Sequence, residues 1–302
     1  MEINDKKRLA AVFSIISNIF LTLLKIICGI LSGSLGIISE AIHSASDFIA
    51  SFVTFFSVVK SSKPADKDHP YGHGKYEDFA GFIEGLLIII ASLFIIYTAS
   101  KKIIFAHSAE IQSYIGIFVM MVAVIMNFIV SGYLFKIAKE SNSISLFADG
   151  QHLRTDVYSS LGVLVGMILI KVTGYVLLDS IIAILIAVFI YKTGYSISKR
   201  AVQNLLDHSL PSDDIETIKG IVKHHSDIAK LKRNGIRARQ VGPTKDIDLI
   251  LQFPEDTSIC ECHKICDEIE NQIQSIFLNS SISIHPEPIC YSKKCQKCCN
   301  KQ

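Results

Sequence analysis

Six long apolar segments in the first two thirds of this chain restrict the folds open to it. They lie at residues 9–32, 35–59, 79–104, 112–136, 145–170 and 176–197. A helix rises about 1.5 Å per residue, so about twenty residues cross the hydrocarbon core of a bilayer. Every backbone polar group must be satisfied inside that core, which favours helices for segments of this length. The sequence therefore predicts an all-α transmembrane domain of six helices.

The composition agrees with a membrane protein that has a smaller soluble part. Of the 302 residues, 50% are hydrophobic, and this excess is concentrated before residue 200. A formal net charge of +2 is too small to indicate nucleic acid as a partner, and the sequence contains no basic stripe with interleaved aromatic residues. We therefore expect the lipid bilayer, and no nucleic acid, as a partner.

The distribution of basic residues predicts the orientation in the membrane. The side that includes both termini carries Lys6, Lys7, Arg8, Lys60, Lys63, Lys67, Lys75, Lys136, Lys139, Arg154, Lys199 and Arg200, whereas the other side has Lys101, Lys102 and Lys171. By the positive-inside rule, both termini are cytoplasmic. The polar N-terminus predicts no cleavable signal. We expect a multi-pass protein of the cell membrane.

Two of the apolar segments carry a histidine and an aspartate four residues apart. These pairs are His43 with Asp47, and His152 with Asp156. On a helix, this spacing places both side chains on one face. Ionisable groups inside a span cost about 2.5–3.5 kcal/mol each on insertion scales, so they normally face a partner or a water-filled cavity. If the two faces meet, two imidazoles and two carboxylates form a complete tetrahedral site for a divalent metal such as Zn²⁺.

The same four side chains can hold either metal or protons, because metal binds the neutral imidazole and the ionised carboxylate. Histidine has an unperturbed pKa of ~6.5, so protons from a more acidic outer side would help to expel the metal. The sequence thus predicts antiport by competition for one site, with helices that rock to open it to one side at a time. A buried ion-pair network is the purely structural alternative, but it is a costly way to hold helices together.

The link from Lys60 to Tyr76 predicts an irregular cytoplasmic loop, because it is rich in proline, glycine and charged residues. It contains three further candidate metal ligands, Asp66, His69 and His73. These oxygen and nitrogen donors suit the same divalent ions as the segment pairs.

After Pro211 the sequence becomes that of a small soluble α+β domain. The predicted order is a helix capped by Ser212 or Asp213, two strands joined at Gly242–Pro243, a helix with a capping box, and a last strand. The expected ranges are 212–225, 236–240, 247–253, a helix beginning at Ser258, and 281–285. An αββαβ unit of about 80 residues is small, so we expect support from a partner subunit. The domain boundaries predicted are 1–208, 209–289 and a Cys-rich tail at 290–302.

Cysteines indicate two further, weaker candidates for metal binding. In the second soluble helix, Cys260, His263 and Asp267 share an outward face, whereas Cys262 and Cys266 lie nearer the apolar face. The tail holds four thiols, Cys290, Cys295, Cys298 and Cys299. Cytoplasmic thiols are usually reduced, which favours metal binding over disulfides, with a disordered, non-binding tail as the alternative.

The chain resembles the cation diffusion facilitator family over nearly its whole length. The resemblance is carried by Ser32 to Asp47, the loop His69-Pro-Tyr-Gly-His-Gly-Lys75, Ala148 to Asp156, Leu205-Leu-Asp207 and the α+β tail. It implies a homodimeric exporter that exchanges cytoplasmic divalent metal for protons, with a metallochaperone-like cytosolic domain. The implied residues are a transport site of His43, Asp47, His152 and Asp156, a loop site of Asp66, His69 and His73, and a charge interlock of Lys75 with Asp207.

The resemblance also bears on the cytosolic site and on the metal. His263, His285 and Glu287 match ligand positions of the family's cytosolic site, but Asn234 and Ile250 stand where other members have histidine. Two histidines with two aspartates resemble the zinc-type transport site, and Fe²⁺, Co²⁺, Cd²⁺ or Mn²⁺ would also fit this donor set.

Two other functions compete with transport. A membrane metal sensor would bind ions in its cytosolic parts without moving them. A membrane metalloenzyme is disfavoured, because protein side chains supply all four ligands and leave no position for a water. We therefore expect no enzyme activity and no resident cofactor.

Overall fold

The computed structural model describes residues 3–32, 35–105, 114–173, 177–225 and 229–289. Within these ranges, the side chains at 29, 31–32, 35–46, 102, 105, 114–117, 159, 162–173 and 177–179 lie outside the described part. The chain divides into two compact units, Met1–Leu205 and Leu206–Gln302. The first unit consists of long helices, and the second combines two helices with a three-stranded sheet. This order agrees with the fold class predicted from the sequence.

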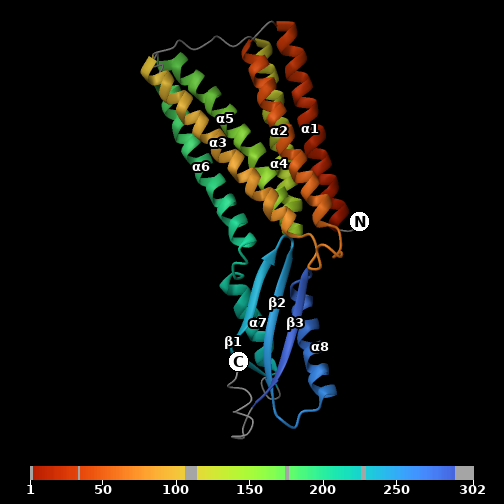
Figure 1. The fold of residues 1–302 in the computed structure, drawn as a ribbon. Helices are drawn as coiled ribbons and strands as arrows, with labels where there is room; N and C mark the ends of the chain where they lie inside the picture. Colours follow the sequence, from red (N-terminus) through yellow and green to blue (C-terminus); the bar gives the residue numbers. More distant parts are fainter. Residues whose placement is uncertain (1–2, 33–34, 106–113, 174–176, 226–228, 290–302) are drawn as a thin grey trace. The chain divides into compact units, whose positions relative to one another are not determined.

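Six helices build the first unit, and each contains one of the predicted apolar segments almost completely (Figure 1). Their bounds are α1 Ile3–Ser32, α2 Leu35–Ser61, α3 Lys75–Phe105, α4 Tyr114–Ser141, α5 Ile144–Thr173 and α6 Leu177–Leu205. Several helices run past the apolar segments, because the polar residues at their ends continue the backbone hydrogen bonding. Among the described residues, four stretches are long and apolar enough to cross a membrane: Ile3–Cys28, Lys75–Lys101, Phe118–Ser141 and Ser180–Leu205.

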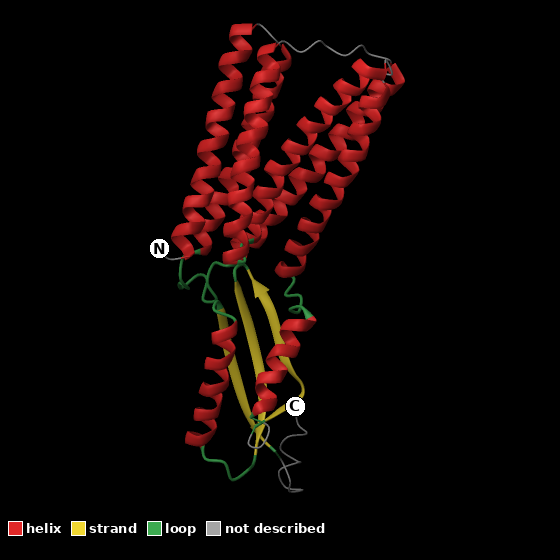
Figure 2. Ribbon diagram, turned by 180° about the vertical axis from the view of Figure 1, so that it is seen from behind, coloured by secondary structure: helices red, strands yellow, loops and turns green. Residues whose placement is uncertain are grey.

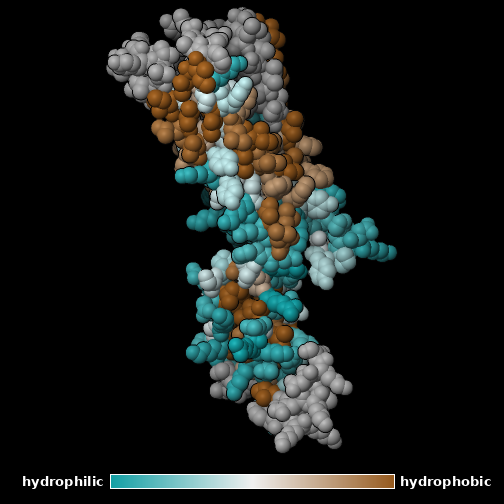
Figure 3. Space-filling model, turned by 60° about the vertical axis from the view of Figure 1, so that its left-hand side comes forward, coloured by the Kyte–Doolittle hydropathy of each residue, from teal (hydrophilic) through white to brown (hydrophobic). Residues whose placement is uncertain are grey.

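The helices pack in pairs and expose apolar side chains outward. Helix α3 lies along α6, α1 along α2, and α4 along α5. Glycines allow the closest approach, since a Cβ added to Gly85 of α3 would lie 2.4 Å from Ser198 Oγ of α6. Figure 3 shows hydrophobic side chains, in brown, over much of one face of this unit. Lipid is the environment that such a surface requires.

The second unit has the αββαβ order predicted from the sequence. Its elements are α7 Ser212–His224, β1 Lys230–Val241, β2 Thr244–Phe253, α8 Ile259–Ile276 and β3 Ser280–Pro288. In the sheet, β2 is central and pairs antiparallel with β1 and parallel with β3. Both helices cover the same face of the sheet, behind it in Figure 1 and in front of it in Figure 2.

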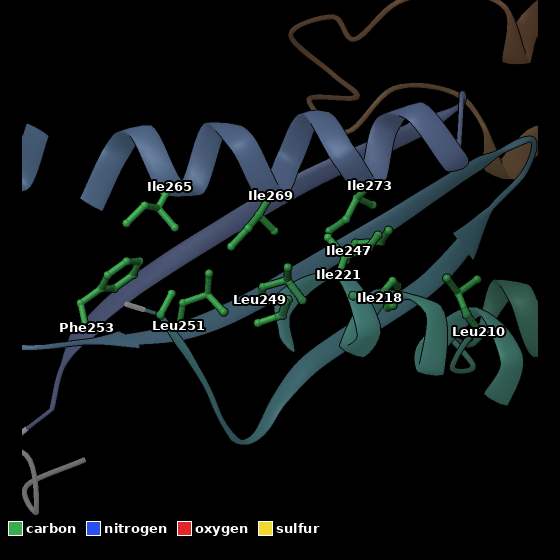
Figure 4. Close-up of a cluster of buried hydrophobic side chains, with 13 residues drawn as sticks. Leu210, Ile218, Ile221, Ile247, Leu249, Leu251, Phe253, Ile265, Ile269 and Ile273 are labelled. Carbon is green, nitrogen blue, oxygen red and sulfur yellow. The ribbon is translucent and has the colours of Figure 1, made fainter. Parts of the chain in front are cut away.

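The core of the second unit lies between the sheet and its two helices (Figure 4). Alternate residues of β2 point into it, as the period of a strand requires, and residues four apart on α8 meet them. The labelled side chains of these two elements are Ile247, Leu249, Leu251 and Phe253 of β2 and Ile265, Ile269 and Ile273 of α8.

The turn and cap predictions for this unit had mixed outcomes. Gly242 adopts a positive φ of 56° in the predicted two-residue turn between β1 and β2. The Ser258 side chain accepts a hydrogen bond from the Glu261 N–H at 3.2 Å, as its predicted cap role requires. The cap prediction for α7 was wrong, because Pro211 occupies that position and makes no side-chain hydrogen bond. Its fixed φ is compatible with the extended backbone just before a helix.

Candidate metal centre

A buried cluster joins α2 to α5 within the first unit. The Asp47 carboxylate of α2 lies 3.1 Å from Nε2 of His152 on α5. Asp156, one turn further along α5, completes a group in which one ligand atom from each residue lies within 4.8 Å of the others. Asp47 and His152 are only 6% and 5% exposed, so solvent does little to weaken their interaction.

The cluster contains three of the four predicted transport ligands. The side chain of the fourth, His43, lies outside the described part of the structure, although its backbone belongs to α2 one turn before Asp47. One imidazole and two carboxylates already form a donor set typical of catalytic or transported divalent metals. The pairing of α2 with α5 thus follows the expectation drawn from the two His-Asp spacings.

One face of α2 continues the polar character of this cluster toward the end of the helix. Ser51 and Thr54 follow Asp47 at helical spacing, and both are fully buried. Ser51 donates a hydrogen bond to Asp149 Oδ1 at 2.9 Å, and Thr54 donates to Glu84 Oε1 at 2.9 Å. A row of polar groups on α2 therefore contacts buried acids from α5 and α3.

Glu84 and Asp149 were not among the residues predicted to have a role, and both are fully buried. Glu84 stands alone as an acid between Asp78 and Lys101 in an apolar segment, and such an isolated charge was the available signal. Asp149 lies one turn before His152 on α5. Further buried hydrogen bonds reach this group from α1, since Asn18 Nδ2 donates to Ser51 Oγ at 2.7 Å.

A buried ion pair between α1 and α3 lies beside the C-terminal end of α2. Lys7 of α1 donates to a carboxylate oxygen of Glu77 on α3, and these side chains are 1% and 0% exposed. Ser61 of α2 donates to the same carboxylate at 2.6 Å. Ser143, just before α5, and Ser145, in its first turn, also donate to it. This carboxylate therefore connects α3 to three other helices, α1, α2 and α5, and to the link between α4 and α5.

The loop between α2 and α3 contains a second group of ligand-type side chains. Asp66 lies 3.5 Å from His69 Nδ1 and 3.4 Å from His73 Nε2. Gly72, at φ 82°, donates its N–H to the His69 carbonyl oxygen, and this turn brings the two imidazole rings to 4.6 Å. The backbone N–H of His69 is the main cause of a lowered pKa for Asp66, which favours the ionised form that binds metal.

The other predicted ligands are placed as follows. Cys260 and His263 of α8 are exposed, and His263 Nδ1 lies 3.5 Å from Asp267. His285 and Glu287 lie on β3, where Glu287 binds Lys232 at 2.9 Å. Among the described residues, neither pair belongs to a group of three ligand atoms within 4.8 Å. The tail cysteines Cys290, Cys295, Cys298 and Cys299 lie outside the described part.

The two members of the predicted charge interlock have separate contacts within their own units. Lys75 donates to the Leu205 carbonyl oxygen at 3.4 Å in the first unit. In the second unit, the Asp207 carboxylate lies 3.1 Å from Arg239. Arg239 also binds Asp246, and this hydrogen bond is the largest cause of a raised pKa for its guanidinium.

A bundle of apolar helices that contains a group of metal-ligand-type side chains, joined to a small α+β unit, is compatible with a membrane carrier of cations. Comparison with known families agrees: residues 11–206 match the cation efflux transmembrane domain, and residues 210–289 match the cytoplasmic domain of cation efflux proteins. The chain therefore belongs to the cation efflux family, also called cation diffusion facilitators, and is a divalent-cation efflux transporter of a membrane.

Individual relatives align over most of the chain. An uncharacterized transporter of Synechocystis is 32% identical, covering 86% of this chain and 83% of its own length. The manganese efflux system protein MneP of Bacillus subtilis is 28% identical over 93% of this chain and 96% of its own. The cation-efflux pump FieF of Shewanella oneidensis is 27% identical over 93% and 94%.

Proposed function

We propose that this transporter exports Zn²⁺ from the cytoplasm in exchange for protons, through a site formed by His43, Asp47, His152 and Asp156. The observation that carries the proposal is the 3.1 Å approach of His152 to Asp47 across two helices, with the half-buried Asp156 in the same group. Protonation of these groups and metal binding exclude each other, which couples the two ions at one site.

The donor set supports zinc as the cargo. Two imidazoles and two carboxylates give Zn²⁺ its preferred tetrahedral nitrogen and oxygen ligands. Mn²⁺ is an alternative cargo, because the relative MneP is named for manganese efflux. Fe²⁺, Co²⁺ and Cd²⁺ also accept such ligands, because affinity alone discriminates poorly among these ions.

The proposed arrangement in the membrane follows from the sequence and the helices. All six helices span the bilayer with both termini in the cytoplasm, as the basic residues predict. The soluble unit, residues 209–289, faces the cytoplasm and supports a homodimer, in which Lys75 and Asp207 form a charge interlock. The loop group Asp66, His69 and His73 then serves as a second metal site at the cytoplasmic surface.

Flux measurements in proteoliposomes test the transport proposal. Zinc uptake driven by a pH gradient should be lost in Asp47→Ala and Asp156→Ala, which remove ligands from the buried group. Glu140→Ala is the matched control, because this exposed acid of α4 contacts only the partly exposed Lys6 among the interactions described. Unchanged flux in the two aspartate variants would reject the site.

A membrane metal sensor is the second candidate, and the exposed Cys260 and His263 are the residues that favour it. A sensor would bind metal without moving it. Stoichiometric zinc binding with no zinc flux under any pH gradient would therefore favour the sensor over the zinc transporter. Zinc flux that requires Asp47 would exclude the sensor.

A further inference from the structure

The buried acids of the first unit differ in how completely their oxygens are satisfied. The Glu77 carboxylate receives hydrogen bonds from Lys7 and from three serine hydroxyls. Glu84 receives the Thr54 hydroxyl on Oε1, and Asp149 receives the Ser51 hydroxyl on Oδ1. Their second oxygens, Glu84 Oε2 and Asp149 Oδ2, are buried and have no hydrogen-bond partner within the described part of the chain.

Glu84 and Asp149 come from different helices, α3 and α5, but neighbouring residues of α2 bind both. Their hydroxyl partners Thr54 and Ser51 lie three residues apart on one helix face, which brings the two carboxylates to the same region of the bundle. Two like charges in a buried site repel each other, so a cation that both carboxylates bind would stabilise their ionised forms. An ion pair with Lys7 supplies that charge for Glu77.

The hydroxyls of α2 hold these carboxylates in position. Ser51 binds Asp149, and Thr54 binds Glu84, from adjacent turns of the same face. The single proton of Ser51 Oγ goes to Asp149, while the same oxygen accepts from Asn18. Such a fully used hydroxyl fixes the carboxylate and leaves its second oxygen available to a ligand.

We infer that Glu84 and Asp149 form a second cation site beside the transport centre. Its donors are oxygens, which suit Mn²⁺ and other hard divalent ions and contrast with the mixed nitrogen and oxygen donors of the transport centre. Asp149 lies one turn nearer the start of α5 than His152. The hydroxyls that bind the two acids lie on the same polar face of α2 as Asp47. The transported ion would occupy this second site on its way to or from the transport centre, and in this role the inference rests on the proposed function.

Mn²⁺ binding to the full-length protein in detergent tests the inference. Bound Mn²⁺ is counted by electron paramagnetic resonance, because free Mn²⁺ gives the strong signal and thiolates bind this ion weakly. The background variant carries Asp66→Asn and Asp156→Asn, which weaken the loop group and the transport centre. It should still bind Mn²⁺, and adding Glu84→Gln or Asp149→Asn should weaken that binding at least tenfold.

Glu140, an exposed acid outside the candidate site, provides the control. Adding Glu140→Gln to the same background should leave Mn²⁺ binding unchanged. If an acid variant fails to fold by circular dichroism, Thr54→Val replaces it, since this change keeps both carboxylates and removes the hydroxyl that holds Glu84. Binding should then fall severalfold.

Equal binding with and without these changes, or no Mn²⁺ bound by the background protein, would overturn the inference. The binding assay requires no flux, so its outcome is separate from that of the transport proposal. Zinc flux that is unchanged in Asp47→Ala would reject the proposed function, but it would not alter the outcome of the Mn²⁺ binding assay.

Discussion

The buried pair of Lys7 and Glu77 should make a large contribution to the stability of the helical unit. The two side chains are 1% and 0% exposed, so removing one charge leaves the other buried without compensation. Such a change costs about 3–5 kcal/mol. We therefore expect Lys7→Met to lower the free energy of unfolding by about this amount, whereas Lys7→Met with Glu77→Gln should cost clearly less than the two single changes added together.

The neighbouring lysine provides a matched control. Lys6 lies 3.4 Å from Glu140, but these side chains are 40% and 37% exposed. An exposed pair of this kind contributes about 0–1 kcal/mol, so Lys6→Met should have little effect. The free energies come from unfolding in detergent followed by circular dichroism. A Lys7→Met protein within about 0.5 kcal/mol of the unchanged protein would refute the reasoning.

Two further predictions concern packing and thiol chemistry. Gly85→Ala should destabilise the first unit by about 1–3 kcal/mol, because the new Cβ would lie 2.4 Å from Ser198 Oγ. Gly220→Ala in α7 meets nothing within 4 Å and should be neutral or stabilising, and equal thermal unfolding of the two variants would contradict this. Burial and the neighbouring Cys262 raise the pKa of Cys266 to about 11. At pH 8, about one Cys266 in a thousand is a thiolate, so iodoacetamide should modify the exposed Cys260 much faster, with the Cys266 rate rising about tenfold per pH unit. Equal rates by mass spectrometry would contradict the raised pKa and the partial burial of Cys266.

Local patterns in the sequence predicted most of the fold. Hydrophobic length predicted the helices of the first unit, and residue alternation with turn signals predicted the αββαβ order of the second. Helix ends were less predictable, because polar residues such as those from Lys75 to Asp78 continue a helix as readily as they end it. The parallel pairing of β3 with β2 depends on contacts between distant segments, which no local pattern encodes.

The candidate site was also predicted only in part from the sequence. Two His-Asp pairs at helical spacing predicted a meeting of α2 with α5, and Asp47 and His152 do lie in contact. The sequence also showed a lone acid at Glu84, but it did not indicate Thr54 or Asp149 as its neighbours. Partners of buried charges come from helix packing, whereas helical spacing specifies only one face of one helix.

Anomalous diffraction at the zinc edge can show whether Asp47, His152 and Asp156 hold the transported ion. Crystals grown with Zn²⁺ should show a peak at about 2.0–2.2 Å from Nε2 of His152 and from oxygens of both aspartates. Peaks confined to the loop group or to the second unit, with these three side chains bound to no metal, would rule out this transport site.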